Sequence, residues 1–120
     1  MKLYDTEWWQ KVLDDWNQSE SKNKFSNLGC VKFEFLEADI PPVVITWDSL
    51  GNGEINFDKI ENINCFSATI KNWTAFINGE FKATMGVLQG KIKFDGNVFK
   101  ILPFTNSFNK LAEISKRHLN

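Results

Sequence analysis

The stretch that decides the fold runs from Phe76 to Asn97 and reads FINGEFKATMGVLQGKIKFDGN. Gly90 lies where the end of a helix favours a left-handed residue, a conformation that glycine adopts without a steric penalty. Residues 91–95 then alternate polar and apolar side chains, which is typical of a strand with one buried face. After a glycine turn, a new apolar helical pattern begins at Val98. The stretch therefore predicts a helix of about residues 82–89, a strand and a second helix in close succession.

Other segments have helical patterns as well. Residues 6–18 carry apolar side chains three and four positions apart, which predicts an amphipathic helix with Thr6 as its N-cap. Its apolar face consists of Trp8, Trp9, Val12, Leu13 and Trp16. Asn72 can cap a helix of about residues 73–79, and a last helix is expected to begin near residue 105.

Four further runs read as strands, at about residues 31–35, 43–47, 55–58 and 65–70. Short polar turns join the first three runs, so an antiparallel meander is expected. Each run has one apolar face, which helices are expected to cover. We therefore expect an α+β fold in which one mainly antiparallel sheet of about five strands has helices packed on one face. No repeat or linker divides the chain, so residues 1–120 are expected to form a single domain.

The glycine-rich pieces resemble the C-terminal half of the sterol carrier protein 2 family. The resemblance rests on GKIKFDG at 90–96, preceded by FING at 76–79 and MGVLQ at 85–89, and it extends over about residues 65–111. It implies a sterol-carrier-like fold that holds one lipid-like molecule, such as a fatty acid, a fatty acyl-CoA or a sterol, in an apolar cavity. The link at residues 71–73 is shorter than in the animal carriers, which leaves the ligand's identity open.

The composition fits this expectation. The 120 residues include five Trp and eleven Phe, enough aromatic surface to fill a core, line a cavity or expose a patch. Residues 1–81 hold seven basic and thirteen acidic side chains, whereas residues 82–120 hold seven basic and two acidic ones. This basic third suggests an anionic headgroup or a transient membrane contact. Nucleic acid is not expected, because the domain as a whole is not positively charged.

Nothing in the sequence points to catalysis. The single histidine, His118, lies near the C-terminus, where chains often fray, and neither a metal-ligand spacing nor a phosphate-binding loop occurs. Cys30 and Cys65 form no CxxC pair, so no metal or other cofactor is expected. Without a signal-peptide pattern or a long apolar run, we expect a cytoplasmic, non-enzymatic protein with free thiols.

Two hypotheses follow for function. In the first, the chain binds or transfers one apolar molecule in a cavity lined by inward strand residues and by helix residues. The candidate lining residues are Phe33, Phe35, Ile45, Trp47, Phe57, Ile92 and Phe94 from strands, and Trp73, Phe76, Ile77, Met85, Leu88, Ile101 and Leu102 from helices. In the second, the core is full, and the face formed by Trp8, Trp9 and Trp16 or the final helix docks another chain. The oligomeric state stays open.

Overall fold

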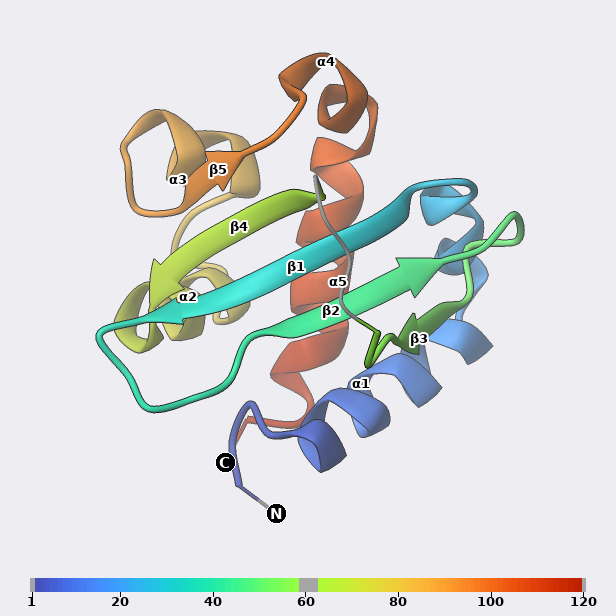
Figure 1. Ribbon diagram of the computed structural model, residues 1–120, viewed down its shortest axis with the longest axis horizontal. Coiled ribbons are helices and arrows are strands. Elements are labelled where there is room, and N and C mark those ends of the chain that lie inside the picture. Colours follow the sequence, from blue (N-terminus) through green and yellow to red (C-terminus); the bar gives the residue numbers. More distant parts are fainter. Residues whose placement is uncertain (1, 59–62, 120) are drawn as a thin grey trace.

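A computed structural model describes residues 2–58 and 63–119. Five strands form one sheet in the order β3-β2-β1-β4-β5 (Figure 1). The strands are β1 (Gly29–Leu36), β2 (Val43–Trp47), β3 (Gly53–Ile55), β4 (Asn64–Thr69) and β5 (Lys93–Asp95). All neighbours are antiparallel except β1 and β4, which are parallel. The expected α+β class and the mainly antiparallel sheet are confirmed, and the first three strands form the expected meander.

The helices α1, α2 and α5 lie together behind the sheet in Figure 1, whereas α3 and α4 flank β5 at one end of the molecule. The α-helices are α1 (Thr6–Gln18), α2 (Ile70–Ile77), α3 (Ala83–Leu88), α4 (Val98–Ile101) and α5 (Thr105–Lys116). Two 3-10 helices, η1 (Glu20–Phe25) and η2 (Leu102–Phe104), complete the fold. None of the helices within residues 2–58 and 63–119 is long and apolar enough to cross a bilayer.

Two helices begin earlier than the sequence predicted. Asp5, not Thr6, caps α1, and its carboxylate accepts a hydrogen bond of 2.8 Å from the backbone N–H of Trp8. Thr69, not Asn72, caps α2, and its hydroxyl accepts a hydrogen bond of 3.1 Å from the Asn72 backbone. Strand β4 therefore passes into α2 without a loop, which places the first turn of α2 against the end of the sheet.

The inner face of the sheet has the register that the alternating pattern predicted. Across it, Phe33 is paired with Val43 on one side and with Phe66 on the other, and Val31 is paired with Ile45. The predicted apolar face of α1 is also buried, with Trp8 and Trp16 exposed by no more than 1%. The hypothesis that the tryptophan face of α1 docks another chain is therefore wrong, because this face is buried in the core of the protein itself.

Strand β3 begins and ends earlier than expected, and of the expected residues 55–58 only Ile55 belongs to it. Asn17 hydrogen-bonds both backbone groups of Gly53, at 2.7 Å to the N–H and 3.0 Å to the carbonyl, and thereby fixes the start of the strand. The Asn56 side chain then accepts from the backbone of Asp58 at 2.8 Å and turns the chain away. Phe57 consequently lies outside the strand and is 82% exposed, so its expected place on the inner face was wrong.

Strand β5 is also shorter than predicted, because residues 91 and 92 belong to the turn that follows α3. The backbone N–H groups of Lys91 and Ile92 both donate to the carbonyl of Gly86, at 2.8 and 3.1 Å. These bonds close the last turn of α3 and bring Ile92 into the interior, where it is 3% exposed. The first residue of β5 is therefore Lys93.

A candidate apolar cavity

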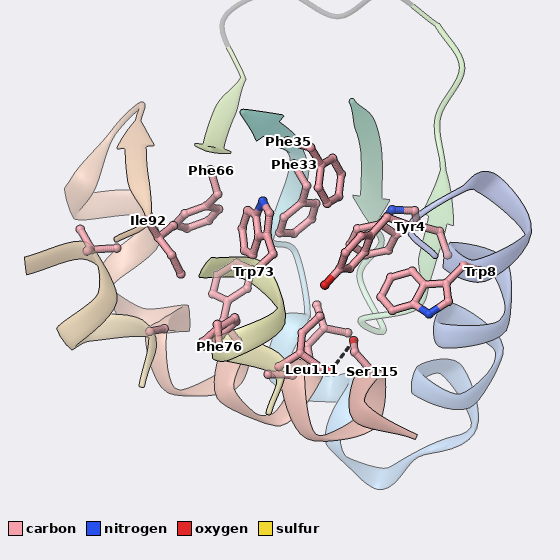
Figure 2. A pocket seen from close by; sticks show the side chains of 16 residues that line it. Tyr4, Trp8, Phe33, Phe35, Phe66, Trp73, Phe76, Ile92, Leu111 and Ser115 are labelled. Carbon is pink, nitrogen blue, oxygen red and sulfur yellow. Dashed lines mark hydrogen bonds between the residues drawn. The ribbon is translucent and has the colours of Figure 1, made fainter. Parts of the chain in front are cut away.

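An apolar recess lies between the inner face of the sheet and the helices α1, α2, α3 and α5 (Figure 2). Figure 2 shows rings from the strands on one side, Trp8 on a second, and α2 and α5 residues beneath. Its lining consists of Tyr4, Trp8, Trp9, Phe33, Phe35, Phe66, Trp73, Phe76, Ile77, Ala83, Val87, Ile92, Phe108, Leu111, Ala112 and Ser115. Among the described residues, none of those that line it is charged.

The free space in this recess is small. The recess spans about 580 Å³ when the part open to solvent is included, but its enclosed free volume is only about 50 Å³. For comparison, an engineered apolar cavity of about 150 Å³ binds a molecule as small as benzene. A lipid-sized ligand would therefore have to displace lining side chains or part of a helix.

Phe33 lies at the centre of the aromatic lining. Its ring stacks on Trp9 with centroids 5.3 Å apart and meets Trp73 edge-on at 5.9 Å. At the other side, Tyr4 packs against Trp8 and Phe35, with centroids 4.8 and 4.9 Å apart. Ring pairs in these geometries stabilise the interior beyond the burial of their area.

Two hydroxyl groups supply polarity to the lining. The Tyr4 hydroxyl lies 2.9 Å from Thr74 Oγ1, and in Figure 2 it points into the space toward α5, where Ser115 lies. Burial raises the pKa of Tyr4, although the bond to Thr74 opposes the shift, so this hydroxyl is neutral at physiological pH. Ser115 is 3% exposed and donates to the Leu111 carbonyl at 2.8 Å. Both hydroxyls have acceptor capacity left for a ligand.

One polar group of the lining has no partner. Within the described part of the chain, the buried indole nitrogen of Trp9 makes no hydrogen bond. An unsatisfied buried N–H costs about 1–3 kcal/mol. Trp9 also borders a second recess beside the N-terminus of α1, which Pro41, Pro42 and Phe57 help to line.

Six of the fourteen candidate residues come together in the cavity: Phe33, Phe35, Trp73, Phe76, Ile77 and Ile92. Three others, Ile45, Trp47 and Ile101, are buried in the core but do not line the recess. Phe94 is half-buried and packs on the lining residue Phe66, with ring centroids 4.9 Å apart.

The remaining candidates are exposed. Phe57 lies beyond β3, and Met85, Leu88 and Leu102 are 46%, 74% and 56% exposed. Helix α3 packs against the interior through its small residues Ala83 and Gly86. At Gly86 the packing is so close that a Cβ would lie 2.6 Å from the Phe81 ring. Met85 and Leu88 therefore face solvent. Ile101 ends α4 and Leu102 begins η2, and the two neighbouring side chains point in different directions, so only Ile101 reaches the core.

Part of the lining was not predicted from the sequence. Phe108, Leu111, Ala112 and Ser115 follow the helical spacing of α5, so this spacing could have placed them on one inner face. Tyr4 could not have been found in this way. It precedes α1, and its φ of 66° is rare for a residue other than glycine.

Two titratable groups outside the cavity, Cys65 and His118, have structural partners. The Sγ of Cys65 donates to Glu34 at 3.0 Å on the outer face of the sheet. Burial, with the neighbouring carboxylate, raises the pKa of Cys65 to about 11, so its thiol is a weak nucleophile at neutral pH.

His118 was expected in a frayed terminus, but its Nε2 lies 2.5 Å from Asp15 and its carbonyl accepts a hydrogen bond from the indole N–H of Trp8. Among residues 2–58 and 63–119, no cluster of three or more metal-ligating side chains occurs.

No protein-family model and no curated protein matches the sequence, whereas solved structures do. A crystal structure of sterol carrier protein 2 is 15% identical, with a TM-score of 0.78 over 96% of this chain and 98% of that one. The chain has the sterol carrier protein 2 fold. This confirms the resemblance seen in the glycine-rich stretch.

Two further structures with this fold match over nearly their whole length. A protein from Thermus thermophilus, described as possibly a sterol carrier protein, is 14% identical with a TM-score of 0.77, covering 100% of this chain and 92% of that one. A ubiquinone synthesis protein named UbiJ-SCP2 is 10% identical with a TM-score of 0.65, covering 98% and 97%. At these identities the likeness establishes the fold alone.

Proposed function

We propose that the protein binds one lipid-like molecule in the cavity and stores or transfers it without chemical change. The observation that carries the proposal is an inner recess lined by rings and aliphatic side chains, with no charge and with two hydroxyls, in a sterol-carrier-like fold. Burial of an apolar molecule against such a lining is favourable. The weak nucleophile at Cys65 and the structural role of His118 fit a non-catalytic protein, and a cytoplasmic location is part of the proposal.

The lining restricts the polar group that a buried ligand can carry. A carboxylate or phosphate buried there would lose its hydration without gaining a cation, which is strongly unfavourable. A ligand hydroxyl can instead donate to the Tyr4 or Ser115 oxygen, and the oxygen of a hydroxyl, ketone or ester can accept from the free indole N–H of Trp9. Among the three expected ligand classes, a sterol-like or other neutral lipid therefore fits the interior best.

A fatty acyl-CoA would have to leave its headgroup outside. A shallow groove lies behind the cavity wall and shares Phe76, Ile77 and Ala112 with it. Lys82 also lines this groove. Because Lys82 is exposed, its contact with an anionic headgroup would be weak and sensitive to salt.

Binding has to enlarge the cavity, and α3 is the part of its wall with the least support. This helix has six residues, and only Ala83 and Gly86 are buried. Its Val87 both lines the cavity and is 38% exposed, so it lies at a boundary between interior and solvent. Displacement of α3 would open the recess at the β5 end of the sheet and would leave the pairing among β1, β2, β3 and β4 unchanged.

The proposal is tested by titrating the protein with a fluorescent sterol below its micelle threshold. We expect saturable binding with energy transfer from tryptophan, and Ala112→Leu should weaken it by filling the recess. Lys116→Leu adds the same side chain to the exposed side of α5 and should leave binding unchanged. Equal binding by the two variants, or no binding of sterol, fatty acid or acyl-CoA by the wild type, would contradict the proposal.

An interaction or dimerisation module with a filled core is the second candidate. The free space of about 50 Å³ favours it, because an ordinary close-packed core has few voids. The same titration separates the two, since a module of this kind binds no lipid probe in its interior.

A further inference from the structure

Helices α3 and α4 and strand β5 form one end of the molecule (Figure 1). This end carries large apolar side chains that face solvent. Leu88 on α3 is 74% exposed, and Phe99 on α4 is 84% exposed. Met85, Val98 and Leu102 are between 46% and 56% exposed. These residues lie within one segment, 85–102, of the chain. We call the surface formed by residues 82–102 the α3–α4 edge.

The same edge is basic. Its charged residues are Lys82, Lys91, Lys93, Lys100 and Asp95, and all of them are exposed. One of the lysines, Lys91, lies over the ring of Phe81, with Nζ 4.9 Å from the centroid. Residues 82–102 carry a net charge of 4 − 1 = +3, residues 103–120 carry 3 − 1 = +2, and residues 1–81 carry 7 − 13 = −6. The edge with the exposed apolar side chains is therefore net positive, whereas the first two thirds of the chain are net negative.

Exposed apolar side chains in the same surface segment as exposed lysines are complementary to an anionic bilayer. The apolar groups can enter the boundary between headgroups and acyl chains, while the ammonium groups stay among the phosphates. The tryptophan face of α1, the other amphipathic surface, is buried against the sheet and is not free to dock. We propose that the α3–α4 edge docks the protein on the surface of an anionic lipid bilayer.

Docking in this way would place a wall of the cavity at the membrane. On α3, Ala83 and Val87 line the recess, whereas Leu88 faces solvent. Insertion of Leu88 into lipid would therefore act directly on the helix that separates the recess from solvent. This connection to ligand entry rests on the proposed function, but docking itself does not, and it can be measured on protein without ligand.

The test is co-sedimentation with vesicles of phosphatidylcholine alone or of phosphatidylcholine with phosphatidylglycerol, at low and at physiological salt. We expect the wild type to bind the anionic vesicles about tenfold or more tightly than the neutral ones, and to lose affinity as salt rises. Leu88→Ser/Phe99→Ser should lower binding to anionic vesicles by at least a similar factor, because both exposed apolar anchors are removed. Lys93→Glu/Lys100→Glu should abolish the preference for anionic lipid.

Two controls match these variants. Leu50→Ser/Phe57→Ser removes two side chains that are 62% and 82% exposed but lie outside the edge. Lys11→Glu/Lys24→Glu makes the same charge change on the acidic part of the chain. Unchanged binding in the edge variants, or an equal loss in the controls, would overturn the proposal. So would a dimer in ultracentrifugation that Leu88→Ser/Phe99→Ser dissociates, because the edge would then be covered by a second copy of the chain.

Discussion

The hydroxyl of Tyr4 lies 2.9 Å from the hydroxyl of Thr74, so the segment that precedes α1 is joined to α2 across seventy positions of the sequence. Tyr4 is 2% exposed, and this bond places its ring in the cavity wall beside Trp8 and Phe35. The bond therefore holds two helices around the recess and keeps a polar group at its surface.

Replacing Tyr4 by phenylalanine should separate these two roles. Tyr4→Phe loses one buried hydrogen bond, which should lower the free energy of unfolding by about 1 kcal/mol. It should also weaken binding of a long-chain alcohol more than binding of the matching alkane, because only the alcohol uses the hydroxyl. Thr74→Val removes the same bond but leaves the Tyr4 hydroxyl free. If Thr74→Val loses the preference for the alcohol as Tyr4→Phe does, the hydroxyl of Tyr4 is not the ligand's partner.

Cys65 should react slowly with thiol reagents at neutral pH. Its pKa of about 11 leaves little thiolate, and the carboxylate of Glu34 opposes formation of more. In a Cys30→Ser background, the alkylation rate of Cys65 should rise with pH and reach half its maximum near pH 11. Glu34→Gln removes the neighbouring negative charge and should move that rise to lower pH. A rise centred at the ordinary thiol value of 9.0 in both proteins would contradict this.

The same thiol should make the fold less stable at alkaline pH. The pKa of Cys65 is about 11 in the folded protein and 9.0 for an ordinary thiol, so the unfolded chain releases this proton first. The stabilisation is complete below pH 9.0 and is lost as the pH rises toward about 11. Urea unfolding of the wild type and of Cys65→Ala across this interval measures the effect. Parallel pH curves for the two proteins would show that Cys65 contributes nothing.

Glu34 should act in the opposite direction at acid pH. The hydrogen bond from Cys65, followed by the contact with Lys32, lowers the pKa of Glu34 below 4.5. The stability from this group is therefore present above pH 4.5 and is lost as the pH falls through the lowered pKa. Glu34→Gln should show a smaller loss than the wild type in acid urea unfolding, whereas Glu54→Gln, on an exposed site of β3, should follow the wild type.

A close contact at Gly53 should make that position intolerant of any side chain. A Cβ there would lie 2.7 Å from Leu13 and 2.8 Å from the indole nitrogen of Trp47. Gly53→Ala should lower the free energy of unfolding by about 1–3 kcal/mol through overpacking between α1 and the sheet. Glu54→Ala, at the next and exposed position, is the matched control in thermal or urea unfolding. A Gly53→Ala protein as stable as this control would show that α1 can shift away from β3.

Much of the fold could be predicted because local patterns agree with the final packing. The inner positions of β1 and β2 follow from period-two alternation, and the tryptophan face of α1 follows from helical spacing. The parallel pairing of β1 with β4 could not be predicted in this way. It depends on where the chain after β3 returns to the sheet, and no local pattern encodes that return.

The cavity was less predictable, because burial does not distinguish core from lining. Phe33 and Ile45 share one face of the sheet, yet only Phe33 reaches the recess. Leu88 has the apolar character of a lining residue, but the close approach of Gly86 to Phe81 turns it outward. Whether an apolar residue lines the recess depends on how the helices pack on the sheet, and this packing also determines the shape of the recess.

Indole N–H signals in a proton–nitrogen NMR spectrum test the central claim most directly. Trp8, Trp9 and Trp73 line the cavity, whereas Trp16 and Trp47 are equally buried outside it and serve as internal controls. On addition of a neutral lipid such as a long-chain alcohol, kept monomeric, binding in the cavity predicts that the first three signals shift while the last two change little. Five unchanged signals at a saturating concentration, or shifts of Trp16 and Trp47 as large as the others, would contradict it.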